Sequence, residues 1–269
     1  MTRPSSSRSW LLAAALFLVA LPAAAQQTTE KPFEPQVGQA GKDVVWVPTP
    51  QALVEKMLDM AKLTPQDFHM DLGSGDGRTV ITAARRGARA LGIEYNPKMV
   101  ELSRHNAQTA GVTARATFQE ADLFTVDLSK ANVITMFLLP SINMKLRPKI
   151  LELRPGTRIV SNTFSMEDWE ADETQTISGD CSSWCTALLW IVPAKVEGTW
   201  KVGQNSLMLE QQFQMLSGTL GSTTITSGRL RGTEITFTAG NATYTGQVEG
   251  STIKGMIKGG PGGSFTATR

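Results

Sequence analysis

The pattern of apolar and polar positions divides the chain into two parts of different character. Up to about residue 195, short apolar runs alternate with stretches in which apolar residues recur at helical spacing. After about residue 197 the pattern has a period of two, and glycines separate the runs. The first part therefore predicts alternating strands and helices, and the second predicts a small antiparallel β domain.

In the first part, each apolar run is followed by a helical stretch. Leu53, Met57 and Met60 recur at helical spacing after Thr49 and Pro50. Pro50 suits the first turn of this helix, with Thr49 as its cap. Further helices are expected at 79–86, 97–110 and 149–153, and strands at 68–72, 90–94, 114–119, 133–138, 158–162 and 187–192.

This alternation predicts an α/β fold with a doubly wound, mostly parallel sheet. In such sheets a ligand lies beyond the carboxyl ends of the strands, near the point where the strand order reverses. Four residues of interest fall at these ends: Gly73, Glu94, Asp122 and Leu139. We assign this domain to residues 43–195 and the β domain, a barrel or a curled sheet, to residues 196–269.

The N-terminus has the pattern of a secretory signal peptide. Arg3 and Arg8 precede an apolar run at 10–21, and an Ala-x-Ala sequence ends at Ala25. The run is shorter than the roughly 20 residues that a membrane span needs. We expect a signal peptide at 1–25, a linker at 26–42, and export to the periplasm or the exterior. The alternative is an uncleaved N-terminal anchor; no later run predicts another span.

The chain has two cysteines, Cys181 and Cys185. An exported protein with an even number of cysteines favours a disulfide. On one extended strand their Cα atoms would lie about 13 Å apart, too far for a bridge, so a bridge requires a bend between them. The alternative is two buried small side chains. Two thiols supply too few ligands for a metal site, and we predict none.

Charge and composition narrow the possible partners. Charged residues make up 19% of the chain, and the formal net charge is +2. The sequence contains no basic block, which argues against a nucleic-acid groove.

A glycine-rich turn follows the strand at 68–72. An acid, Asp71, precedes three alternating glycines, Gly73, Gly75 and Gly77. A dinucleotide fingerprint fails here, because Arg78 stands at its sixth position. The pattern resembles the first motif of class I S-adenosylmethionine (SAM) methyltransferases, and that resemblance implies SAM as co-substrate and a seven-stranded type of sheet.

Residues on the first strand and its turn are candidates for the methionine end of SAM. Gly73, Ser74 and Gly75 permit a close approach of the backbone, because glycine has no Cβ. Asp71 can orient the loop or face the methionine amine, directly or through water.

Two later acids are candidates for the nucleoside end. Glu94 lies about 20 residues past the turn, where a carboxylate accepts ribose hydroxyls in dinucleotide folds. Asp122 can accept from the adenine amine, with Leu123 or Phe124 packing on the ring.

A narrower resemblance rests on the segments 47–50, 71–78, 92–94 and 137–140. They are similar to the mitochondrial lysine methyltransferases that modify the ATP synthase c-subunit and the adenine nucleotide translocase. The resemblance implies N-methylation of a protein lysine, with Thr49, Leu139 and Pro140 as candidates on the acceptor side. The tetrad at 138–141 lacks the polar amide of nucleic-acid amino methyltransferases, which argues against a nucleobase.

Methyl transfer requires no dedicated acid or base, so we assign no catalytic residue. Two other functions remain open: methylation of a small molecule or lipid, and an exported binding protein that keeps the fold without turnover. We interpret His69 as a packed core histidine rather than a base. We interpret Trp169, Trp184 and Trp190 as core or edge packing rather than as a cation cage for methylated amines.

Overall fold

The computed structural model describes residues 1–2, 33–179 and 181–269. Phe33–Arg269 forms one compact unit. The signal peptide predicted at 1–25 lies outside the described residues, apart from residues 1–2. Within the described residues, no helix has both the length and the apolar character needed to cross a bilayer.

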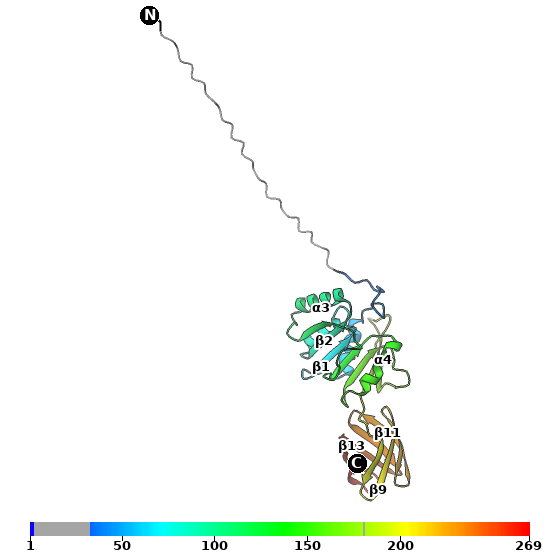
Figure 1. Cartoon of the computed structure of the whole chain (residues 1–269). Helices are drawn as coiled ribbons and strands as arrows, with labels where there is room; N and C mark the ends of the chain where they lie inside the picture. The colour runs from blue at the N-terminus through cyan, green and yellow to red at the C-terminus, as the bar shows by residue number, and fades with distance from the viewer. Residues whose placement is uncertain (3–32, 180) are drawn as a thin grey trace. The chain divides into compact units, whose positions relative to one another are not determined.

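The first domain is built on a seven-stranded sheet with the order β3-β2-β1-β4-β5-β7-β6 (Figure 1). The first five strands in this order, β3, β2, β1, β4 and β5, run parallel. Strand β7 pairs antiparallel with both β5 and β6. The predicted doubly wound, mostly parallel sheet is confirmed. The strands are β1 Phe68–Leu72, β2 Arg89–Glu94, β3 Ala116–Glu120, β4 Val133–Met136, β5 Arg158–Asn162, β6 Glu173–Thr176 and β7 Thr186–Ile191.

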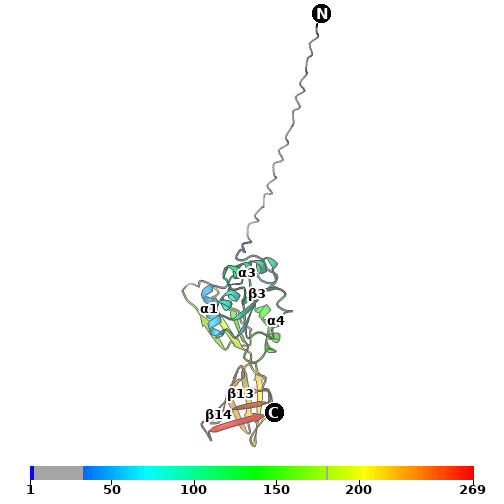
Figure 2. The ribbon, with the colours of Figure 1, turned by 90° about the vertical axis from the view of Figure 1, so that its left-hand side faces the viewer.

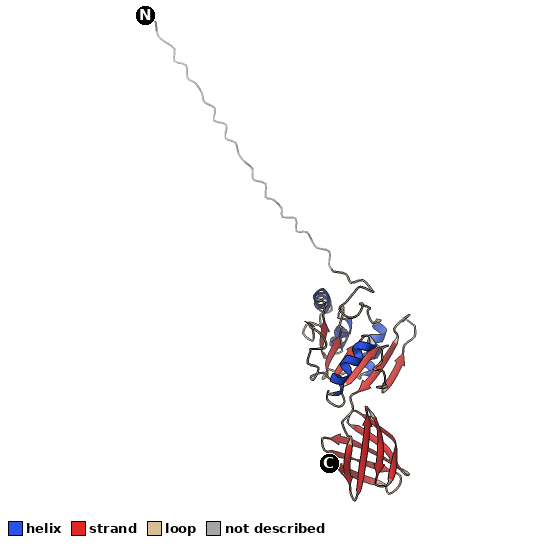
Figure 3. Ribbon diagram, turned by 45° about the vertical axis from the view of Figure 1, so that its right-hand side comes forward, coloured by secondary structure: helices blue, strands red, loops and turns tan. Residues whose placement is uncertain are grey.

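Helices cover the two faces of this sheet. Side chains of α1 (Gln51–Met60), α2 (Arg78–Arg85) and α3 (Pro97–Thr109) pack in clusters on one face. Side chains of α4 (Pro140–Leu151) join Met70 and Ile134 on the other face. Figure 3 shows that these helices belong to the first domain and that the second is made of strands.

Three local expectations were wrong. Pro50, not Thr49, is the N-cap of α1, and no side chain caps this helix. The helix expected at 149–153 begins at Pro140, whose fixed φ suits a first turn, while Pro148 inside it disguised the helical pattern. Strand β6 was missed because Glu173–Thr176 is a polar edge strand without an apolar alternation.

The second domain is a closed, antiparallel barrel of eight strands (Figure 2). Trp200, Phe237 and Tyr244 are buried in its core. Closure leaves no free sheet edge among these strands for another chain to pair with. Its strands are β8 Gly198–Val202, β9 Asn205–Gln212, β10 Met215–Leu220, β11 Thr223–Arg231, β12 Glu234–Ala239, β13 Ala242–Glu249, β14 Thr252–Lys258 and β15 Gly263–Thr268.

Candidate functional site

The glycine-rich turn connects β1 to α2 in a conformation that favours glycine. The φ angles of Gly73, Gly75 and Gly77 are 76°, 54° and 82°, in the left-handed region that residues with a Cβ seldom adopt. A Cβ on Gly75 would lie 2.7 Å from Nε1 of Trp46. The alternating glycines therefore allow both the turn and the close packing of an indole against it.

The cofactor-side candidates line one cavity, which we call the glycine-loop cavity. It lies where β1, β2 and β3 end, as expected for the carboxyl edge of a parallel sheet. Thr49 also lines it, whereas Pro140 instead begins α4. The candidates that line it are Asp71, Gly73, Ser74, Gly75, Glu94, Asp122 and Leu123.

Asp71 is buried at the floor of this cavity. Thr135 Oγ1 donates a hydrogen bond of 2.6 Å to Asp71 Oδ1, and His69 Nε2 lies 2.8 Å from the same hydroxyl. Because the hydroxyl proton points at Asp71, the hydroxyl accepts from Nε2–H of His69. Desolvation by burial raises the pKa of Asp71 to about 7 and lowers the pKa of His69 to about 3. His69 is thus a neutral core residue, as predicted, and it orients Asp71 through Thr135.

Glu94 is held by two backbone amides. Gly75 N donates to Oε2 at 3.0 Å, and Asn96 N donates to Oε1 at 2.9 Å. A carboxylate offers about four lone pairs, so these two bonds fix its orientation and leave acceptor capacity for both hydroxyls of a ribose.

Asp122 forms an ion pair that the sequence did not predict. Lys42 Nζ lies 2.6 Å from Asp122 Oδ2 and 4.4 Å from the centre of the Tyr95 ring. The hydrogen bond from Lys42 holds the pKa of Asp122 below its usual value. Phe124 N donates to the other oxygen at 2.9 Å. The adenine contact expected of Asp122 stays a prediction, and any such amine would share the carboxylate with Lys42.

Residues 38–47 form a short hairpin, which we call the strap. Gly38 N donates to Trp46 O, and Trp46 N donates to Gln39 O, each at 2.9 Å. Residues 39–47 line the glycine-loop cavity. The sequence predicted a linker up to residue 42, which includes the first half of the strap. The cavity residues that the strap contacts lie far from it in the chain, so no local signal indicated this contact.

A second cavity adjoins the first, and we call it the aromatic cavity. Phe137, Phe164, Trp184 and Leu139 line it together with the strap. Phe137 and most of the strap line both cavities. Leu139, an acceptor-side candidate, therefore faces the second cavity, and Thr49 faces the first.

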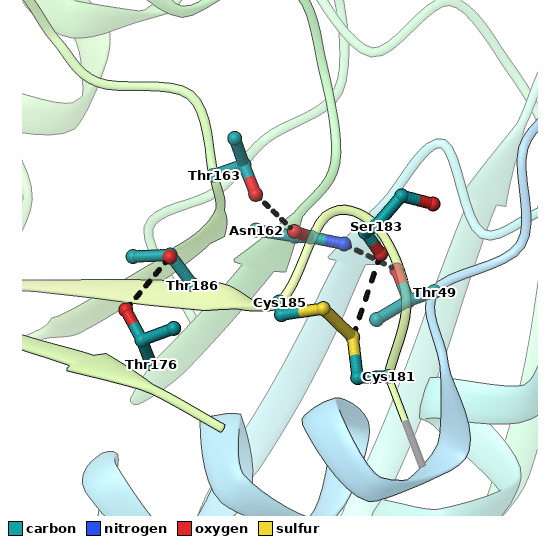
Figure 4. Close-up of a disulfide and its surroundings, with 8 residues drawn as sticks. All are labelled: Thr49, Asn162, Thr163, Thr176, Cys181, Ser183, Cys185 and Thr186. Atoms are coloured by element: carbon teal, nitrogen blue, oxygen red, sulfur yellow. Dashed lines mark hydrogen bonds between the residues drawn. A yellow bond between two sulfur atoms is a disulfide. The ribbon is translucent and has the colours of Figure 1, made fainter. Parts of the chain in front are cut away.

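The two cysteines are joined in a disulfide, and their Cα atoms lie 5.8 Å apart (Figure 4). The chain bends between them, which resolves the two alternatives in favour of a bridge. Trp184 lies inside this disulfide loop, residues 181–185, and 41% of its surface is exposed. Trp169 and Trp190 are fully buried core residues, as predicted. Trp184 packs against the rings of Phe137 and Phe164, and its ring also lines the aromatic cavity.

The chemistry of the glycine-loop cavity fits SAM. The hydroxyl of Ser74 is buried against Gly92 and has no hydrogen-bond partner within the described residues. Asp71 and Glu94 supply acceptors for an amine and a ribose. The described residues contain no group of three or more His, Cys, Asp or Glu side chains placed to hold a metal ion.

Comparison with known proteins agrees with this geometry. Residues 71–173 match the model of the ANTKMT methyltransferase domain. A protein-lysine N-methyltransferase of Saccharolobus islandicus is 44% identical over 133 residues, which are 48% of this chain and 83% of that protein. The adenine nucleotide translocase lysine N-methyltransferase of Mus musculus is 39% identical over 119 residues. These residues cover 44% of this chain and 52% of the mouse protein, so the chain spans about half the length of that relative.

One solved structure has a similar fold and a related ligand. It is described as an RNA methyltransferase from Salinibacter ruber in complex with S-adenosylhomocysteine. It is 46% identical to this chain with a TM-score of 0.53, over 56% of this chain and 96% of the other. The sheet, the glycine-loop cavity and these relatives agree: the chain belongs to the ANTKMT methyltransferase family of SAM-dependent methyltransferases.

Proposed function

We propose that this methyltransferase transfers the methyl group of SAM to the side-chain nitrogen of a lysine in a protein. The observation that carries the proposal is the adjoining position of the two cavities, which have Phe137 and most of the strap in common. SAM in the glycine-loop cavity would present its methyl group toward the aromatic cavity. A long, flexible side chain entering the apolar cavity could reach that methyl group.

The reaction is an in-line displacement. The lysine nitrogen attacks the methyl carbon with its lone pair, the carbon–sulfur bond breaks, and its electrons neutralise the sulfonium. The lysine enters as an ammonium and must release a proton to water before its nitrogen attacks, and an apolar surrounding favours this release by lowering its pKa. The residues of this chain mainly align the two reactants and exclude water. Leu139, Phe137 and Phe164 are suited to the exclusion of water because they are apolar and line the approach.

The names of the relatives differ in their acceptor. Those of the archaeal and mouse relatives specify lysine, whereas the Salinibacter protein is described as acting on RNA. Two features favour lysine in this chain. The aromatic cavity is lined by Leu139 and three aromatic rings. In addition, segment 138–141 has no side-chain amide that could hydrogen-bond a nucleobase.

We also propose that the protein is exported. The pattern of residues 1–25 supports this, and so does the disulfide, because disulfides persist mainly in oxidising compartments. A fusion of the first 30 residues to a reporter would test it. Export of the reporter supports the proposal, and a reporter retained in the cytosol contradicts it.

The acceptor is tested with SAM carrying an isotopic methyl label. The mature protein is incubated with separated envelope and cytosolic fractions, and the labelled products are hydrolysed and identified. We expect methyl-lysine, and less label with the Glu94→Ala variant at a limiting concentration of SAM. Label in RNA, in lipid or in a small molecule would contradict a lysine acceptor. SAM binding without any transfer would contradict turnover.

A further inference from the structure

We propose that Trp184 is a specificity-determining residue for the methyl acceptor, and that the Cys181–Cys185 bridge holds it in place. The acceptor group that it selects is an ammonium on an aliphatic chain, before and after its first methylation. This inference rests on the proposed lysine acceptor. It concerns residues beyond 173, where the match to the family model ends.

Three aromatic rings from separate segments meet at the aromatic cavity. The centre of the Phe164 ring lies 5.8 Å from that of Phe137 and 5.3 Å from that of Trp184. The Phe137 and Trp184 centres are 5.9 Å apart. Phe137 lines both cavities, whereas Trp184 lines the aromatic cavity alone. Trp184 is therefore placed to act on the acceptor without contacting the methyl donor.

The backbone at two of these rings has an unfavourable conformation. Trp184 has a φ of 58°, and Thr163, immediately before Phe164, has a φ of 59°. Residues other than glycine seldom adopt such values, which persist only where the surroundings enforce them. Trp184 lies between Cys181 and Cys185 in the chain, and the disulfide that joins these two cysteines closes the loop (Figure 4). At Thr163 the backbone N–H bonds Thr186 O at 2.7 Å.

The lining of the cavity matches an ammonium on an aliphatic chain. Leu139 and the strap valines offer apolar contacts to the chain, and ring faces attract a cation. Asp43 adds a carboxylate to the same lining, while the ammonium of Lys42 is paired with Asp122. A methylated lysine remains cationic, so the same rings would receive it for a second transfer.

The test compares Trp184→Ala with the conservative variant Trp184→Phe. Initial rates are measured with labelled SAM and solubilised envelope protein, and SAM affinity is measured by calorimetry. We expect Trp184→Ala to raise the apparent KM for the acceptor about tenfold and to reduce the share of di- and trimethyl-lysine. SAM affinity should stay within about twofold of wild type, since Trp184 does not line the donor cavity, and Trp184→Phe should restore most of the loss.

Two outcomes would overturn the role of Trp184. One is an unchanged acceptor KM in Trp184→Ala. The other is a loss of SAM affinity as large as the rise in KM, which would indicate a general structural role. Wild-type protein that transfers no label to lysine would instead refute the proposed function itself, and this inference with it.

The bridge is tested by the double variant Cys181→Ser, Cys185→Ser. We expect a raised acceptor KM with SAM affinity unchanged, as in Trp184→Ala. Addition of a reductant to the wild-type protein should have the same effect and leave the double variant unaffected. An acceptor KM equal to that of wild type in the double variant would refute the role of the bridge.

Discussion

The two cavities adjoin, yet they are built in different ways. The glycine-loop cavity takes its polar groups from the ends of three neighbouring strands, and backbone amides orient Glu94. The aromatic cavity is assembled from the segment after β4, the loop after β5, the disulfide loop and the strap. The first uses hydrogen bonds that a short motif can encode, whereas the second uses rings that only the tertiary fold brings together. The polar groups of the donor side can thus be predicted from short motifs, whereas the rings of the acceptor side cannot.

The largest effect on the donor side is expected from Glu94→Ala. Loss of this carboxylate removes the proposed ribose acceptor and the partner of Gly75 N, so SAM binding should weaken by about 1–3 kcal/mol. Calorimetry measures the change. Glu120→Ala is the matched control, because Glu120 is the register partner of Glu94 on β3 and does not line the cavity. An unchanged affinity in Glu94→Ala would refute the ribose contact.

A pH dependence of SAM binding is expected from Asp71. Burial raises its pKa to about 7, so the carboxyl is mostly protonated at about pH 6 and mostly ionised at about pH 8. If the ionised form faces the methionine amine, SAM affinity should rise about tenfold over this range. Asp71→Asn should remove this step, which separates it from titration of the ligand itself. If the pH profile of SAM affinity is the same in Asp71→Asn as in wild type, Asp71 does not bind the methionine amine in its ionised form.

The same shift affects folding of the SAM-free protein with the opposite sign. The native carboxyl binds its proton more tightly than the unfolded one, whose pKa is near the ordinary value of 3.8. The contribution of Asp71 to stability should therefore fall as pH rises from about 4 to 7 and level off above that. Denaturant titrations of wild type and Asp71→Asn across this range measure it, and parallel curves would contradict the raised pKa.

A smaller shift is expected from Thr135→Val. The hydroxyl of Thr135 lowers the pKa of Asp71 by donating to it, so its loss should move the midpoint of the SAM-binding profile to higher pH. It also leaves Nε2–H of His69 without its acceptor. A midpoint that stays in place or moves to lower pH would show that the hydrogen bond does not control Asp71.

The smallest effect is expected from Lys42→Met. Lys42 belongs to the strap and lines both cavities. Exposed ion pairs contribute little, so we expect SAM affinity to fall only about two- to fivefold. The acceptor KM should change as well, because Lys42 lines both cavities. SAM affinity and the acceptor KM are measured at low and at high salt, because salt screens an exposed ion pair. A strong loss confined to SAM would mean that the strap serves the donor alone.

Much of the first domain could be predicted from sequence because its signals are local. Strands β1 and β5 have the predicted bounds. Glu94 and Asp122 were placed near the glycine turn because strand ends of a parallel sheet share one edge. Leu139 lines the adjoining aromatic cavity, which the sequence did not predict, and its role on the acceptor side stays a prediction.

The rest depends on contacts between distant segments. Thr49 was expected to cap a helix, but its hydroxyl accepts from Asn162 Nδ2 at 3.3 Å, far along the chain. Lys42 looked like part of a linker until its partner Asp122 was placed. Trp184 could not be distinguished from the core tryptophans Trp169 and Trp190 by composition. Its difference arises from the disulfide loop.

A crystal structure with a bisubstrate analogue, adenosine joined through a 5′ nitrogen to a lysine side chain, tests the pairing of the two cavities most directly. We predict the ribose at Glu94 and the lysine chain among Phe137, Phe164 and Trp184. An analogue whose adenosine lies in the glycine-loop cavity while its lysine arm extends away from these rings would contradict the assignment of the aromatic cavity to the acceptor.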